Sequence, residues 1–234
     1  MRLSAPIYRL KHDARQLSRR DSIPLHAALD RIAALEGFRT WSQLAAKHDE
    51  ANPASHVFAR LRPGELLVTA ARPGQGKTLF CLELSVEAIK QGHRAYFFSL
   101  EYTEQDVASR LERLGFGARD LGDRFVFDGS EQISADYIIG RMQAVKPGSL
   151  VVVDYLQLLD QVRSKPDLAT QVHALKQFAR DSGLIIAVIA QVDRCFETSG
   201  RDFPDLADIR RPNPFDLTLF DRTCFLSGGK VRFQ

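Results

Sequence analysis

Cysteine is scarce in this chain of 234 residues, and its three copies are far apart. Cys81, Cys195 and Cys224 are odd in number and lack the spacing of metal ligands. This pattern argues against a disulfide framework and against a zinc site. We therefore expect buried or incidental thiols in a reducing compartment.

Long apolar runs are also missing. The longest, such as residues 184–190, fall far short of the roughly 20 residues that a membrane-spanning helix needs. The basic N-terminus is not followed by the apolar core of a signal peptide. Together these features predict a cytoplasmic protein with no membrane partner.

Neither sign of charge dominates the composition. The 32 Lys and Arg against 29 Asp and Glu give a net charge of +3, which is compatible with nucleic acid but too small to indicate it. The hydrophobic fraction of 44% and the charged fraction of 26% are those of an ordinary globular protein. The length allows one full α/β domain with a small addition.

The first 50 residues differ from the rest because they contain no strand-like run. They read as a small helical region, with one helix from Pro24 to Leu35 that ends at Gly37 and another, containing Trp41, that Thr40 can cap. Two short helices around a glycine have the outline of a DNA-reading helix-turn-helix, but docking on a neighbouring subunit or another protein partner is the favoured interpretation. The early basic residues of this region are Arg2, Arg9, Lys11, Arg15, Arg19 and Arg20. The polar, proline-containing residues 49–55 predict a linker into a main domain at 56–234.

From residue 65 onward, strand-like and helix-like patterns alternate. The predicted strands are 65–70, 94–100, 124–127, 150–153, 184–190, 216–226 and 230–233, and the predicted helices are 77–91, 103–115, 134–146 and 168–182. Near-continuous apolar strands such as 150–153 and 185–189 are typical of a parallel sheet covered on both faces. The predicted fold is a three-layer α/β domain with a mostly parallel central sheet.

The junction between the first strand and the first helix of this domain predicts a phosphate-binding loop. Its eight residues are Ala71, Arg72, Pro73, Gly74, Gln75, Gly76, Lys77 and Thr78. The two glycines let backbone N–H groups point at phosphate oxygens, Lys77 can reach the β- and γ-phosphates of ATP, and Thr78 can bind Mg²⁺. The pattern G-x-x-x-x-G-K-[ST] has Ala71 at its first position. The helix that follows repeats Leu79, Leu82, Val86 and Ile89 at helical spacing, and the alternative is a glycine-rich turn in an ordinary βα unit.

Three polar residues end apolar strands, where ligands gather in parallel sheets. Asp154 can hold the magnesium shell in the manner of a Walker B aspartate, although such a residue is often only a helix cap. Glu101 can orient or deprotonate the attacking water, or be a solvated residue that opens a helix. Gln191 can contact the γ-phosphate and report its loss, or hydrogen-bond only to backbone.

Four strings, ARPGQGKT, FSLE, VVVDYLQLL and AQVDR, occur in this order from residue 71 to residue 194. With this spacing, residues 60 to about 212 resemble the C-terminal ATPase domain of DnaB-type replicative helicases, within the wider RecA-like group. The resemblance implies that alanine is accepted at position 71. It also implies phosphate and magnesium binding by Lys77 and Thr78, a catalytic carboxylate at Glu101, a Walker B acid at Asp154 and a γ-phosphate sensor at Gln191.

The resemblance further implies a hexameric ring that threads single-stranded DNA and binds each ATP between two subunits. The loops facing the channel would be residues 161–167, with Arg163 and Lys165, and residues 194–205, with Arg194 and Arg201. The alternative is that both are ordinary solvent-exposed loops. The Lys-x-Arg pair that reaches a neighbour's γ-phosphate in the family has its nearest candidate in Lys230 and Arg232. A plain hairpin edge is the alternative there.

The sequence departs from the family at its N-terminus, where about 50 unrelated residues replace the large helical domain that binds primase. The leading hypothesis is an ATP- and Mg²⁺-dependent, oligomeric, DnaB-like helicase or single-strand DNA translocase. The other is a RecA-like nucleotide switch that regulates a protein partner through residues 1–50 without unwinding. The intact Glu101, Asp154 and Gln191 favour the motor, while the short chain favours the switch.

Overall fold

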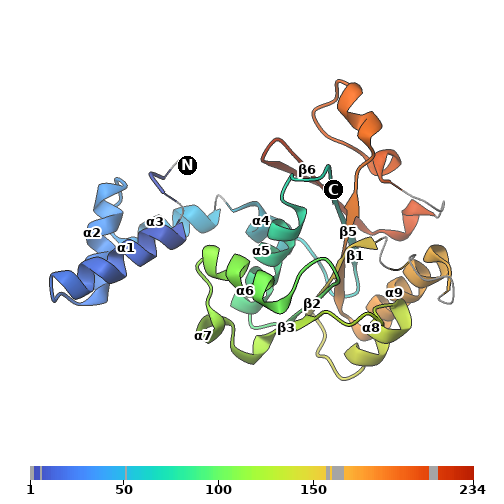
Figure 1. The fold of residues 1–234 in the computed structure, drawn as a ribbon, viewed down its shortest axis with the longest axis horizontal. Coiled ribbons are helices and arrows are strands. Elements are labelled where there is room, and N and C mark those ends of the chain that lie inside the picture. The colour runs from blue at the N-terminus through green and yellow to red at the C-terminus, as the bar shows by residue number, and fades with distance from the viewer. Residues whose placement is uncertain (1–2, 6, 51, 157–158, 160–165, 211–215) are drawn as a thin grey trace.

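The computed structural model of the chain describes residues 3–5, 7–50, 52–156, 159, 166–210 and 216–234. An α/β body fills most of the molecule, and the first three helices lie to one side of it (blue in Figure 1). None of the helices in these ranges has both the length and the apolar character that a membrane crossing requires.

The body is built on a seven-stranded sheet in the order β3-β2-β4-β5-β1-β6-β7. The strands are β1 (Leu66–Ala71), β2 (Ala95–Ser99), β3 (Phe125–Asp128), β4 (Leu150–Asp154), β5 (Ile185–Gln191), β6 (Arg222–Ser227) and β7 (Lys230–Phe233). All neighbours from β3 to β6 are parallel, and only the edge strand β7 is antiparallel to its neighbour. The predicted mostly parallel sheet is confirmed.

Helices cover both faces of the sheet, and those that follow β1 lie in the connections between strands. They are α1 (Ile7–Arg20), α2 (Leu25–Leu35), α3 (Trp41–Glu50), α4 (Pro53–Phe58), α5 (Lys77–Lys90), α6 (Glu104–Arg113), α7 (Ala118–Leu121), α8 (Ala135–Met142) and α9 (Leu168–Ser182). Short 3-10 turns lie at η1 (Gly122–Arg124), η3 (Arg194–Thr198), η4 (Leu206–Asp208) and η5 (Leu217–Leu219). Where sequence patterns had predicted α8 and β6, both elements are shorter. For β6 the cause is Asp216, whose carboxylate accepts a hydrogen bond from the Thr218 N–H at 2.8 Å and starts a turn where a strand was expected.

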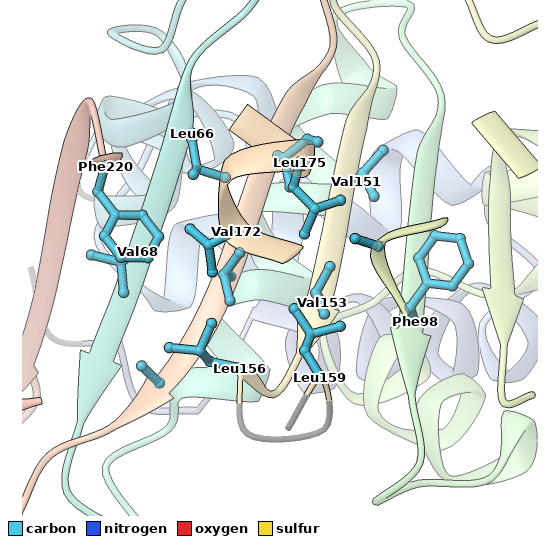
Figure 2. Close-up of a cluster of buried hydrophobic side chains, with 14 of the residues drawn as sticks. Leu66, Val68, Phe98, Val151, Val153, Leu156, Leu159, Val172, Leu175 and Phe220 are labelled. Carbon is cyan, nitrogen blue, oxygen red and sulfur yellow. The ribbon is translucent and has the colours of Figure 1, made fainter. Parts of the chain in front are cut away.

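A hydrophobic layer on each face of the sheet holds the body together. On one face, α8 and α9 pack against the strands, and Figure 2 shows Val172 and Leu175 of α9 over Val68 of β1 and Val153 of β4. The other face packs against α4, α5 and α6. Every residue of β1, β2 and β4 is buried, which explains why these strands read as uninterrupted apolar runs.

One helix occupies part of the segment that was expected to be a linker. The Asn52 side chain accepts a hydrogen bond from the Ala54 N–H at 3.0 Å and caps α4, which has Pro53 in its first turn. Val57 and Phe58 are buried against the same layer as α5. The linker expected at 49–55 thus includes the end of α3 and the start of α4, while the division into domains 1–50 and 56–234 stays a prediction.

The buried face of α5 is wider than its helical spacing suggested. Phe80, Cys81 and Leu84 are buried beside the expected Leu82. Leu79 repeats at the same helical spacing but is 41% exposed. Its place in the first turn of α5 puts it at the edge of the pocket described next rather than over the sheet.

Candidate nucleotide-binding site

The strand order brings the predicted site residues to one edge of the sheet. Strands β1, β5, β4 and β2 are consecutive neighbours, so their carboxyl ends meet there. Ala71 pairs with Gln191 across β1 and β5, and Ser99 pairs with Asp154 across β2 and β4. Segments that are more than 100 residues apart in sequence thus form one site.

A pocket of about 360 Å³ opens at this edge. Its lining includes eight predicted residues: Pro73, Gly74, Gly76, Lys77, Thr78, Glu101, Asp154 and Gln191. A pocket of this volume is in the range of small-ligand sites. The predicted phosphate loop and the predicted strand-end residues therefore belong to the same cavity.

The glycines of the loop set its path into α5. Gly74 has φ +78° and Gly76 has φ +81°, in the left-handed region that residues with a Cβ rarely adopt. An added Cβ would meet nothing within 4 Å at either position, so the requirement for glycine is one of backbone angle rather than space. The turn directs the N-terminus of α5, with its partial positive charge, at the pocket.

Burial shifts the pKa values of Lys77 and Asp154 in opposite directions. Burial lowers the pKa of Lys77, although the nearby charges of Asp154 and Glu101 oppose the shift. Burial raises the pKa of Asp154 to about 6, with a smaller raising contribution from Glu101 and a lowering contribution from its hydrogen bond with Thr78. Each group is thus charged at a cost that a bound ion of opposite sign would offset.

The Thr78 hydroxyl donates a hydrogen bond to Asp154 at 3.0 Å. A hydroxyl and a buried carboxylate at this separation supply the hard oxygen ligands that Mg²⁺ prefers. Lys77 Nζ donates to the Arg72 carbonyl at 3.3 Å, so its ammonium lies back over the loop. The donor set fits a magnesium–phosphate ligand.

The other two predicted residues lie at the pocket wall with different exposure. Glu101 is exposed, and its backbone N–H donates to the Ser99 hydroxyl at 3.2 Å. Gln191 is half-buried, and its carbonyl accepts from the Arg210 N–H at 2.7 Å. The side chains of both residues line the cavity, while their backbones are tied to the adjoining segments.

Arg110 was missed by sequence reasoning and also lines the pocket. Its guanidinium carbon lies 4.2 Å from the ring centroid of Tyr102, another lining residue. A capping box between Thr103 and Asp106 starts α6, and Arg110 follows two helical turns after the cap, on the same face. The two-turn spacing from Thr103 to Arg110 is the signal that could have identified Arg110.

Two residues of the phosphate loop point away from the pocket and link it to other segments. Arg72 forms an ion pair with Glu197 of η3 at 2.7 Å and donates to the Val192 carbonyl at 2.9 Å. The Gln75 side chain accepts from the Gly228 N–H at 3.0 Å, in the turn between β6 and β7. Neither link could be read from the sequence, because each joins residues more than 100 positions apart.

The remaining predicted residues lie outside this cavity. Arg232 of β7 stacks over Phe203 and Phe225 at 5.2 and 5.4 Å and donates to the Pro204 carbonyl. Arg201 forms ion pairs with Asp205 and Asp208, each at 2.6 Å.

Arg194 is exposed at the start of η3. Arg163 and Lys165 fall outside the described residues. The expected nucleic-acid contacts of these arginines and of Lys165 therefore stay predictions.

Together the strand order, the loop and the strand-end carboxylates define a RecA-like P-loop NTPase domain. Residues 33–195 match the AAA domain family, and the chain belongs to that family. The chain is also similar in sequence to replicative DNA helicases of the DnaB type.

Among similar proteins is the replicative DNA helicase DnaB of Mycoplasma pneumoniae, 26% identical over 212 residues that cover 72% of this chain and 44% of that protein. The Mycoplasma genitalium DnaB is 28% identical over 199 residues, which cover 68% of this chain and 42% of that protein. The chain therefore spans less than half the length of these relatives.

Solved structures share the fold at lower identity. A DnaB-like replicative helicase superposes with a TM-score of 0.59 at 16% identity, covering 92% of this chain and 64% of that one. A separately solved ATPase domain superposes with a TM-score of 0.60 at 17% identity, covering 78% of this chain and 81% of that one. The RecA-like fold predicted from the sequence is confirmed.

Proposed function

We propose that this chain hydrolyses Mg-ATP and couples hydrolysis to movement along single-stranded DNA, as an oligomeric DnaB-like translocase or helicase. One observation carries the proposal: Lys77, Thr78, Glu101, Asp154 and Gln191, from four strand ends, line one pocket. These are the side-chain types that a phosphoryl-transfer site needs. The likeness to replicative helicases supports DNA as the polymer on which the motor acts.

Each side chain has a role that follows from its place. Lys77 and the N-terminus of α5 bind the β- and γ-phosphates. Thr78 and Asp154 would hold Mg²⁺, which neutralises charge on the phosphates. Glu101, exposed at the mouth of the site, orients the attacking water and accepts its proton.

Gln191 gives the site a route to the segment that follows β5. In the proposed mechanism its amide contacts the γ-phosphate, while its carbonyl holds Arg210 at the far end of residues 192–210. A bridge between Val192 and Ile209 closes this segment into a loop. Loss of the γ-phosphate would thus affect the contacts at both ends of the loop.

The same loop is the proposed contact with DNA, through Arg194 and Arg201. Phosphate binding by Arg201 would require its ion pairs with Asp205 and Asp208 to open. Arg163 and Lys165 are proposed to contribute from the neighbouring loop. Such contacts would be sequence-independent and weakened by salt.

Oligomerisation is proposed because Arg110 is the sole arginine among the described residues that line the pocket. An arginine from a neighbouring subunit would supply further positive charge to the transition state, and Arg232 near the end of β7 is the candidate. Its stacking on Phe203 and Phe225 would have to give way, or be rebuilt, when subunits assemble.

Two substitutions test the site, and they should differ in whether nucleotide binding is lost together with turnover. Lys77→Ala should abolish nucleotide binding or turnover. Glu101→Gln should retain ATP binding but lower turnover by about 10²-fold or more, because it removes only the proton acceptor. Binding is measured with a fluorescent ATP analogue and turnover by phosphate release.

Matched controls are Lys47→Ala on α3 and Glu104→Gln in the first turn of α6, both exposed and outside the pocket. Each should behave like the unmodified chain. Equal turnover of Glu101→Gln and the unmodified chain would remove Glu101 from its proposed role.

A second candidate function is a nucleotide switch that acts on a protein partner through residues 1–50. The position of α1, α2 and α3 to one side of the α/β body favours it, since they add no residue to the nucleotide pocket (Figure 1). A switch would not need DNA for its ATPase activity, whereas the motor would.

A further inference from the structure

A large cleft lies on the side of the molecule that carries the N-terminal helices. It has a volume of about 1000 Å³ and lies between α1 and the region where α6 ends and α7 begins. Lys11 of α1 helps to hold this arrangement, since its Nζ lies 5.7 Å from the ring centroid of Phe116. The cleft shares no lining residue with the nucleotide pocket.

The lining of this basic cleft is dominated by positive charge. It contains Arg9, Lys11, His12, Arg15, Arg19 and Arg119 against the carboxylates of Glu112 and Asp120. Helix α1 alone carries five Lys and Arg and one acidic residue, so its net charge of +4 exceeds the +3 of the whole chain. The positive charge of the protein is therefore concentrated at this helix.

The four arginines among the described residues that line the cleft have no acidic partner in the described part of the chain. Arg9, Arg15, Arg19 and Arg119 form no ion pair with any residue in the described ranges. By contrast, Arg20, on the same helix but outside the lining, pairs with Asp21 at 2.8 Å. Unpaired guanidinium groups gathered around a hollow repel one another, so the arrangement favours an anionic ligand.

The shape of the charge pattern favours a linear polyanion over a single small anion. Lys11, Arg15 and Arg19 recur every four residues and so lie along one side of α1. From Arg9 to Arg19 the helix rises about 15 Å, a distance that spans several phosphates of a nucleic acid strand. A single phosphate would use only a fraction of these groups.

The kinds of residue that line the cleft distinguish between two kinds of polyanion. Apart from the imidazole of His12, the side chains of the described residues that line the cleft are charged, and the remaining lining residues are glycines. A protein partner would be expected to find apolar anchors at the centre of its interface, whereas phosphate contacts need only charge and hydrogen-bond donors. The imidazole of His12 is the one aromatic ring among these described lining residues and offers little area for stacking bases.

We propose that the basic cleft binds the phosphodiester backbone of a nucleic acid strand, independently of base sequence and of the nucleotide pocket. The contact is additional to the loop contacts proposed for translocation. It gives the N-terminal helices a function of their own: they hold the strand against the outer side of the ATPase body.

The test replaces Arg9, Arg15 and Arg19 together with alanine and measures binding of a labelled single-stranded oligonucleotide by fluorescence anisotropy at several salt concentrations. We expect at least a tenfold weaker affinity at low salt. The slope of log affinity against log salt should become shallower by about 2, since each lost phosphate contact on a single strand removes about 0.7.

The control variant replaces Arg20, Arg31 and Arg39 with alanine, which removes the same charge from the same N-terminal region but outside the cleft. It should keep the affinity and the slope of the unmodified chain. ATPase activity without DNA and the melting temperature of both variants establish that the fold is intact.

Equal losses in the two triple variants would overturn the proposal, because the effect would then follow from net charge alone. A cleft variant that keeps its oligonucleotide affinity but loses binding to polyglutamate would also overturn it, in favour of an acidic protein partner. Loss of ATPase activity through Lys77→Ala leaves the cleft unchanged, so the two proposals fail separately.

Discussion

The buried carboxylate of Asp154 lowers the stability of the folded protein when it is charged, and the same charge is proposed to help bind Mg²⁺. Its carboxylate is 1% exposed, and burial raises its pKa to about 6 from an ordinary value of 3.8. The folded protein therefore binds this proton more tightly than the unfolded chain does. The cost of the buried charge is fully present above pH 6 and is relieved as the pH falls from 6 towards 4.

Asp154→Asn is accordingly expected to stabilise the ligand-free protein at pH 8 by about 1–3 kcal/mol, since a shift of one pKa unit corresponds to about 1.4 kcal/mol. The asparagine oxygen can still accept the Thr78 hydrogen bond. The advantage should shrink between pH 6 and pH 4, as measured by urea unfolding. Glu83, whose pKa burial raises to about 7, is present in both proteins and cancels in the comparison.

The same substitution should lower the affinity for Mg-ATP, because the carboxylate that faces Thr78 is lost. In the unmodified chain, that affinity should rise with pH through about 6, as Asp154 ionises. A variant that is less stable than the unmodified chain at pH 8 would contradict this account of Asp154.

At the scale of elements, the contacts of the phosphate loop connect the site to the rest of the body. The Arg72–Glu197 ion pair joins the loop to η3, and the contact between Gln75 and Gly228 joins it to the β6–β7 turn. The first segment is a proposed DNA contact, and the second precedes the strand with Arg232. A change in the loop on ATP binding would therefore reach both elements through direct contacts.

Glu197→Gln should weaken the first connection with little effect on stability, because Glu197 is 60% exposed and such pairs contribute at most about 1 kcal/mol. We expect ATPase activity without DNA to change less than about twofold, well within 1 kcal/mol of barrier, while stimulation by DNA is reduced severalfold. Asp202→Asn in the same segment removes the same charge and serves as the control. Equal loss of stimulation in both variants would indicate a general effect of charge rather than the ion pair.

Local patterns were sufficient to predict β1, the phosphate loop and α5, because these elements and their chemistry are contiguous in sequence. Glu101, Asp154 and Gln191 could be predicted to meet because parallel strands end at one edge. The α4 helix was missed because its first residues are small and polar, and its apolar residues come only at its end. Arg110 could have been predicted from its helical spacing after Thr103.

The outward contacts of the site could not be predicted. Glu197 meets Arg72, and Gly228 meets Gln75, only after residues 120 or more positions apart have been brought together by the sheet. Arg232 lies opposite Phe225 across the β6–β7 hairpin, so that contact is local, whereas its contact with Phe203 depends on how the segment after β5 approaches β7. Sequence periodicity carries no information on how such loops approach one another.

At the scale of the whole molecule, the chain combines a RecA-like body of the AAA domain family with a strongly basic N-terminal helix. The body contains the residues proposed to bind nucleotide, and the α1 side contains the basic cleft. Two separate nucleic-acid contacts would let one part hold a strand while the loops after β5 move along it. The cytoplasmic location stays a prediction from the sequence.

The most direct test of the proposed motor is ATP hydrolysis by the full chain with and without single-stranded DNA, measured on samples whose mass is determined in the same buffer with ATP and Mg²⁺. We predict an oligomer whose turnover DNA increases severalfold. A monomer whose turnover is indifferent to DNA would contradict the proposal and leave the nucleotide switch.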